Sequence, residues 1–364
     1  MGPPETVIRA AAPGTMPGTD FRRAAAQLEA ELAAPHTAAV PDLPARGHHG
    51  SQLGRSIAQL VELPAELTSY GWRLVQRPGA DHQRCSALLR SDVDTLADVR
   101  GAQAELGKEL TSLQVEALGP LSLAARLHLP NGEKVLIDHG ARRDLTHSLA
   151  AGLAEHVMHV QRSVGPEALC VVLQEPDYPQ VRTGTIPTAS GYRTIRALGR
   201  EETRNMIGVV VEALRAAGAD QVILDCGQPL EGEHLEDFFH RASSAADGFV
   251  ISTSHTSARQ WERAAELVEA GGLVWAGLLH ATPAGAGRTL PEVSNLMRRL
   301  TGPWQSLGMP SASLASVTVA GYGAADRHQL AEVSERDFLQ TWTRLRDTAD
   351  ALTETMHQGE ESFR

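Results

Sequence analysis

Short apolar segments recur along the chain, and a longer segment with a helical pattern separates each one from the next. The clearest apolar segments are Leu113–Leu118, Leu169–Leu173, Val222–Leu224, Phe249–Ile251, Leu273–Leu279 and Val317–Ala320. Their spacing, commonly about 30–50 residues, leaves room for a crossover helix between parallel strands. Nearly continuous apolar strands are typical of a parallel sheet that helices cover on both faces. The alternation therefore predicts an α/β fold.

The helices have their own signals. The segment Asp144–Val160 carries apolar residues at four-residue steps, which gives one apolar stripe. The segment Glu201–Ala217 begins with acidic residues and ends before a glycine, as helices often do. Two further helices are expected over Ser257–Ala270 and residues 336–355.

The length of the chain decides between two α/β folds. Eight β/α units need about 250 residues, and insertions take such folds past about 400. The 364 residues therefore suit a single (β/α)8 TIM barrel over residues 11–356, with disordered ends at 1–10 and 357–364. A doubly wound open sheet is the competing prediction, and it is disfavoured because no Gly-x-Gly-x-x-Gly follows the first strand.

Charge and cysteine content narrow the class of function. The formal net charge is −11, so the chain has no general attraction to nucleic acid or anionic lipid. Three widely spaced cysteines without a Cys-x-x-Cys pair indicate a reducing compartment. No apolar run approaches the roughly 20 residues that span a bilayer, and the first residues lack a signal-peptide pattern. We therefore expect a cytoplasmic protein without nucleic-acid or membrane partners.

The residues that follow the apolar segments are the candidate site, because TIM-barrel active sites lie at the carboxyl ends of the strands. These positions are mostly polar or glycine. They are Gly119, Gln174 and Glu175, Asp225 and Cys226, Ser252–His255, His280 and Gly321–Gly323, with the early loop Gly14–Gly18 added to them.

Each candidate also has a structural interpretation. Glu175 precedes a proline and would then be a solvated loop acid. Asp225 would cap the following turn. Cys226 at a strand end would be a small buried apolar residue. His255 and His280 would be structural as well.

Several stretches resemble one known family. Gly14–Thr19 resembles the Gly-Ser-x-Pro-Gly opening of cobalamin-independent methionine synthases, especially the short single-barrel proteins of actinobacteria. The resemblance runs from residue 12 to residue 355 and is strongest up to residue 195. The other matching stretches are Leu43–Gly47, Gly71–Leu74, Arg77–Gly79, Asp138–Leu145 and Pro187–Tyr192.

The resemblance implies a fold and a reaction. The family is a TIM barrel, in a superfamily that includes uroporphyrinogen decarboxylase, and it transfers a methyl group from a methylated folate to the thiol of homocysteine. A zinc ion removes the thiol proton and holds the thiolate as the nucleophile. The family's zinc ligands are a His-x-Cys at one strand end, which reads His-Cys-Cys in the short relatives, a Glu at the next strand end, and a late Cys.

This sequence departs from the family at every zinc ligand. The His-Cys-Cys element aligns with Leu224–Cys226 or Asp225–Gly227, so the histidine is absent. The Glu and the late Cys align near Ser252 and Ala320, and the substrate-holding Asp-Glu-Pro has become Gln174–Pro176. A catalytic zinc needs three protein ligands. We therefore expect no zinc requirement, with Cys226 the one remnant ligand unless His255 or His280 completes a new set.

Two hypotheses follow. In the first, the chain is a methyltransferase-family enzyme that uses a homocysteine-like thiol and a methylated folate. Its predicted catalytic residues are Cys226, Asp225 and Glu175, and its predicted substrate-binding residues are Gly14, Thr15, Gln174, Ser252, Tyr192 and Gly119. In the second, the barrel is catalytically silent and serves as a ligand-binding or regulatory protein, its protein partner unknown. A decarboxylase-like role has only the shared fold in its favour, and fold alone does not give function.

Overall fold

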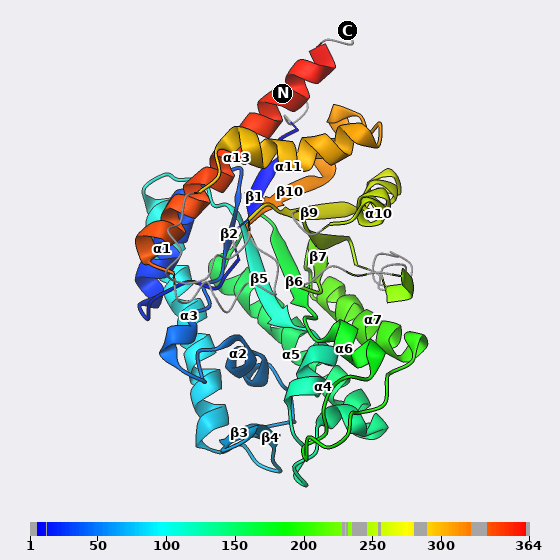
Figure 1. Ribbon diagram of the computed structural model, residues 1–364. Helices are drawn as coiled ribbons and strands as arrows, with labels where there is room; N and C mark the ends of the chain where they lie inside the picture. The colour runs from blue at the N-terminus through cyan, green and yellow to red at the C-terminus, as the bar shows by residue number, and fades with distance from the viewer. Residues whose placement is uncertain are drawn as a thin grey trace.

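The molecule is built on a closed barrel of parallel strands (Figure 1). The computed structural model describes residues 6–11, 13–227, 230, 232–234, 246–253, 256–279, 290–321 and 333–361. Around the barrel the strand order is β1-β10-β9-β8-β7-β6-β5-β2. The bounds are β1 Arg9–Ala11, β2 Thr37–Ala39, β5 Ser112–Leu118, β6 Leu169–Gln174, β7 Gln221–Asp225, β8 Gly248–Ser252, β9 Leu273–Gly277 and β10 Val317–Ala320. The predicted TIM barrel is confirmed.

Helices follow the strands and cover the outside of the barrel (Figure 1). The longer ones are α1 Phe21–Glu31, α3 Ala80–Glu105, α5 His139–Val164, α7 Arg200–Ala216, α10 Ala258–Glu269, α11 Val293–Ser306 and α13 Glu335–Glu361. The helices expected from the apolar stripes and end signals correspond to α5, α7, α10 and α13. Ser257, the residue before α10, accepts a hydrogen bond from the Gln260 backbone and forms a capping box with it.

Short elements gather at the carboxyl ends of β5 and β6 (Figure 1). They are α2 Gln52–Ala58, α4 Pro120–Arg126, α6 Tyr178–Thr183 and the antiparallel hairpin β3 Ala65–Thr68 with β4 Gly71–Leu74. We call this end of the barrel the mouth. The hairpin is an insertion between β2 and β5 that was not predicted from the sequence.

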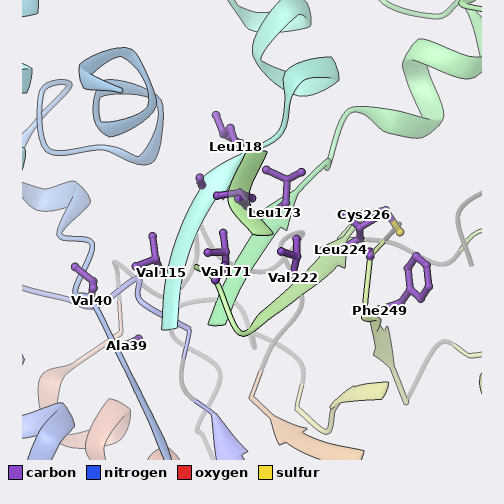
Figure 2. Packing of buried hydrophobic residues seen from close by; sticks show 14 of the residues in the cluster. Ala39, Val40, Val115, Leu118, Val171, Leu173, Val222, Leu224, Cys226 and Phe249 are labelled. Carbon is purple, nitrogen blue, oxygen red and sulfur yellow. The ribbon is translucent and has the colours of Figure 1, made fainter. Parts of the chain in front are cut away.

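The two faces of each strand differ in what they contact. Outward residues such as Val115, Val171 and Val222 belong to the large core between strands and helices (Figure 2). The strand register aligns Cys170 with Gln221 and Val250 with Trp275, which puts these residues on the opposite, inward face. A separate buried cluster fills the inside of the barrel, consisting of Ala11, Cys170, Val172, Ile223, Val250, Trp275 and Ala320. The inner core is therefore apolar below the mouth.

The first and last strands close the barrel. β1 pairs with β10 through Arg9 and Thr318, and the backbone N–H of Ile8 donates to Thr353 of α13 at 2.9 Å. β1 thus begins inside the segment that was expected to be disordered, and α13 continues past the expected domain end to Glu361. Within the described ranges, no helix is both long and apolar enough to cross a membrane.

Candidate functional site

Polar residues line the inward face of the barrel near the mouth. Gln114 and Glu116 lie on β5, and Gln174 and Asp225 end β6 and β7 side by side in register. The amide of Gln114 donates to Glu116 Oε1 at 2.6 Å. Gln114, Gln174 and Asp225 are buried, while Glu116 is half-buried. The apolar interior therefore gives way to amides and carboxylates at the mouth.

Loops after β1 and β2 add a second set of polar groups. The backbone of Met16 donates to Asp42 O at 2.9 Å, and Asp42 donates to Gly14 O at 2.7 Å. The Thr15 hydroxyl lies 3.5 Å from Asp42 Oδ2. A Cβ on Gly14 would lie 2.6 Å from the carbonyl oxygen of Val40 and 3.2 Å from Glu116 Oε2. Gly14 is needed here because the loop passes close to both the second strand and the Glu116 carboxylate.

Helix α2 covers this side of the mouth and is fixed by a buried carboxylate. Asp92 of α3 accepts from Arg46 at 2.8 Å and from Arg55 at 2.6 Å. One turn before Arg55, the Gln52 amide donates to Gln174. A cavity of about 10 Å³ lies beneath the helix, lined in part by Asp42, Gln52, Arg55 and Glu116. This volume is room for about one water molecule.

Glu175 directly follows β6, and its carboxylate lies at the beginning of α4. Its two carboxylate oxygens accept from the backbone N–H groups of Leu121 at 3.0 Å and Ser122 at 2.7 Å. The side chain is fully buried, and burial raises the pKa of Glu175 to about 7, against the lowering effect of these hydrogen bonds. Gly119 lies against the same carboxylate. These contacts anchor the first turn of α4. Glu175 is therefore not a solvated loop acid.

Asp225 and Cys226 point into different surroundings. Asp225 Oδ1 accepts from the backbone N–H of Gly227 at 2.7 Å, which is the turn-capping contact. Cys226 is buried in the outer core, and its sulfur lies near Phe249 and Leu224 (Figure 2). The described contacts fit the structural interpretation of both residues, and their catalytic roles stay predictions.

The remaining predicted residues are spread out. Ser252 ends β8 on the inward face, in register with Gly277. Tyr192 is 94% exposed, in the loop after α6. Thr15, Gly14 and Gln174 lie at the mouth together, whereas Gly119 is beside Glu175. His255 and His280 lie outside the described residues.

The described residues at the mouth do not supply a donor set that suits zinc. No group of three His, Cys, Asp or Glu side chains that could hold a metal ion occurs among the described residues. Cys226 faces the outer core, while Asp225, its neighbour, lies on the inward face. Two adjacent strand residues cannot turn to one ion, because they point to opposite faces.

Gln114, Glu116 and Asp42 were not predicted as site residues from the sequence. The strand Ser112–Leu118 reads Ser-Leu-Gln-Val-Glu-Ala-Leu, in which polar and apolar residues alternate. A period of two puts the polar residues on one face of a strand. That alternation was the available signal. No comparable pattern marks Asp42, which is brought to the site by a loop.

Comparison with known proteins gives a likeness of fold. No family model matches the sequence, and no curated protein matches it. The chain is similar to a B12-independent methionine synthase from Shewanella sp. W3-18-1, solved in complex with selenomethionine, at 9% identity and a TM-score of 0.60, over 97% of this chain and 99% of that one. A xylanase from Cellvibrio japonicus, solved with xylopentaose, gives 12% identity and a TM-score of 0.42, over 96% of this chain and 68% of that one. The likeness to the first of these structures shows a shared barrel fold.

Proposed function

We propose that this protein is a methionine-synthase-like barrel whose mouth binds a small amino acid of the homocysteine class. The observation that carries the proposal is the placement of Glu116 on the inward face beside Gln114, close to Asp42 and Gln174. Carboxylates and amide oxygens accept hydrogen bonds, and an amino acid offers an ammonium group with three donors. The similar methionine synthase was solved with an amino acid bound, which supports the same ligand class here.

The proposed reaction is transfer of a methyl group from a methylated folate to the thiol of that amino acid. The sulfur–carbon bond forms as the carbon–nitrogen bond of the folate breaks. The thiol proton leaves to solvent, and the folate nitrogen takes up a proton. No described group of residues holds a metal to lower the pKa of the thiol. A free thiol has a pKa of about 8.5, so only a few per cent is ionised at neutral pH. Without such a metal, the reaction would be slow near pH 7 and would accelerate with rising pH.

Binding of L-homocysteine and L-methionine, measured by isothermal titration calorimetry, tests the ligand class. E116Q keeps the size of the side chain and removes its charge. A hydrogen bond to a charged group contributes about 1.5–3 kcal/mol, so E116Q should weaken binding about 10- to 100-fold. E155Q is the matched control, because Glu155 is exposed on α5. Equal affinities in wild type and E116Q would show that Glu116 does not contact the ligand. If neither amino acid binds, the proposal is overturned.

A catalytically silent binding protein is the second candidate. It is favoured by the contacts of the three predicted catalytic residues: Glu175 anchors α4, Asp225 caps a turn and Cys226 packs in the outer core. A methyl-transfer assay between pH 7 and 9 separates the two candidates. Homocysteine binding with turnover that rises with pH supports the enzyme. Binding without methyl transfer at any pH supports the silent barrel.

A further inference from the structure

A second cavity lies at the end of the barrel opposite the mouth. Its volume is about 100 Å³, and we call it the basal cavity. It is lined by residues at the amino ends of the strands and by the segments that lead into them. Its side chains that can donate or accept hydrogen bonds include Arg9, Thr37, Ser112, Asp220, Gln221, Trp275 and Thr318.

The strand register gathers hydrogen-bond donors on one side of this cavity. Arg9 of β1 is in register with Thr318 of β10, and Thr318 with Trp275 of β9. Residues in register share a face, so these three side chains belong to one inward-facing row. Thr37 lies on β2, on the other side of β1. Asp220 precedes β7, which is on the opposite side of the barrel from β1 in the strand order. The donor side chains of Arg9, Thr37, Trp275 and Thr318 thus form an arc on the side of the cavity away from the Asp220 carboxylate.

Within this arc, Trp275 is the residue that most clearly lacks a hydrogen-bond acceptor within the described ranges. The side chain is 3% exposed, and its Nε1–H has no hydrogen-bond partner among the described residues. An indole N–H can only donate, so only an acceptor can satisfy it. Arg9 is half-buried and forms no ion pair in the part of the chain that the structure describes. A buried donor without a partner among the described residues and a guanidinium therefore line the same space.

The other polar groups around the cavity are engaged or neutral. The Ser112 hydroxyl donates to Glu167 at 3.3 Å, and Asp220 Oδ2 accepts from the Leu169 backbone at 2.7 Å. Cys170 also lines the cavity, and burial, with nearby carboxylates, raises the pKa of its thiol. The thiol stays uncharged at neutral pH and does not repel an anion.

We propose that the basal cavity binds a small oxyanion of the carboxylate or phosphate type, held by the Arg9 guanidinium, the Trp275 indole N–H and the hydroxyls of Thr37 and Thr318. The size is suitable, since a cavity of about 150 Å³ holds a molecule as large as benzene. Guanidinium groups pair well with both kinds of oxyanion. The site is independent of the function proposed for the mouth.

Indole N–H resonances of the intact protein in 15N-resolved NMR spectra test this proposal. The chain has five tryptophans, and W275F identifies the resonance of Trp275. Inorganic phosphate and acetate are titrated separately, with ionic strength held constant by sodium chloride. We expect a saturable downfield shift of the Trp275 indole proton with at least one of the two ions. The ion that saturates at the lower concentration identifies which kind of oxyanion the cavity prefers.

R9Q supplies the decisive variant, because Arg9 is half-buried and the change keeps a polar side chain. R9Q should weaken binding of the ion that saturates in wild type at least about tenfold, as expected for loss of a charge-assisted hydrogen bond. R90Q, at an exposed arginine of α3, should leave the titration unchanged. A Trp275 resonance that responds to neither ion would overturn the proposal. So would equal affinities in wild type and R9Q, compared on whichever indole resonance shifts, which needs no W275F protein.

Discussion

Glu175 fills the space that any side chain at Gly119 would need. A Cβ at residue 119 would overlap Oε1 of Glu175 and lie 2.5 Å from its Cδ. The carboxylate cannot withdraw easily, because the backbone N–H groups of Leu121 and Ser122 hold both of its oxygens. The first turn of α4 and the end of β6 are thereby locked together at the mouth.

Gly119→Ala should therefore destabilise the fold. Overpacking of a buried site costs about 1–3 kcal/mol, and the anchored carboxylate puts this variant toward the upper end. Gly101→Ala is the matched control, since Gly101 lies within α3 and a Cβ there meets nothing within 4 Å. Replacing glycine by alanine inside a helix should stabilise the protein by about 0.5–1 kcal/mol. Urea unfolding measures both, and an unchanged G119A would mean that the carboxylate moves freely.

The pH dependence of stability should contain a contribution from Glu175. Its pKa is raised from 4.5 to about 7 by burial. The folded state therefore favours the protonated acid. The stabilisation from protonated Glu175 is complete below about pH 4.5, the ordinary pKa of this group in the unfolded chain. It is lost as the pH rises through about 7, the pKa in the folded protein.

The loss amounts to about 3 kcal/mol, from about 1.4 kcal/mol for each pKa unit. Unfolding free energies of wild type and E175Q between pH 5 and 8 isolate this effect, because the other titrating groups are common to both proteins. Wild type should lose stability relative to E175Q as the pH rises. Curves that stay parallel over this range would show that the Glu175 carboxyl titrates normally.

Removing the carboxylate of Asp92 should loosen α2. Asp92 is 2% exposed and pairs with both Arg46 and Arg55. Deleting one partner of a buried ion pair costs about 3–5 kcal/mol, since the remaining charge is left without compensation. We expect Asp92→Ala to fall in this range by urea unfolding. The control Asp98→Ala breaks the exposed pair with Arg22 and should cost less than about 1 kcal/mol. Similar losses in the two variants would contradict this role of Asp92.

Thiol reactivity tests the surroundings of the cysteines. All three are buried, and burial raises the pKa of Cys85 to about 12, with Asp81 and Glu66 adding to the effect. Since the thiolate is the reactive form, a disulfide reagent should modify the native protein slowly and all three thiols after unfolding. A fast phase in wild type that disappears in C226A would instead identify Cys226 as an activated thiol, as the enzyme hypothesis requires.

Strongly patterned elements of the barrel could be predicted from sequence, and weakly patterned ones could not. The strands β6 to β10 contain Val, Ile or aromatic residues, which favour strands. β1 and β2 read Arg-Ala-Ala and Thr-Ala-Ala, and alanine is depleted in strands. Their strand conformation comes from pairing with β10 and β5, which is tertiary information.

The candidate site shows the same division. The positions of Gln174 and Asp225 at the mouth followed from the apolar runs before them. Glu116 was missed because Leu113–Leu118 was taken as one apolar segment, although its polar and apolar residues alternate and alternate residues on a strand face opposite sides. Asp42 and Arg55 depend on how α2 folds back over the strands, a long-range contact with no local sequence pattern.

The pairing of β1 with β10 also has a consequence for synthesis of the protein. Arg9 leaves the ribosome well before Thr318, its neighbour in the sheet, because the two residues are far apart in the sequence. Until then β1 has an unpaired edge, and the inner cluster that joins Ala11 to Ala320 lacks one of its sides. Chains stalled before residue 317 should therefore expose an open sheet edge, the kind of surface that chaperones protect and that pairs with other unfinished chains.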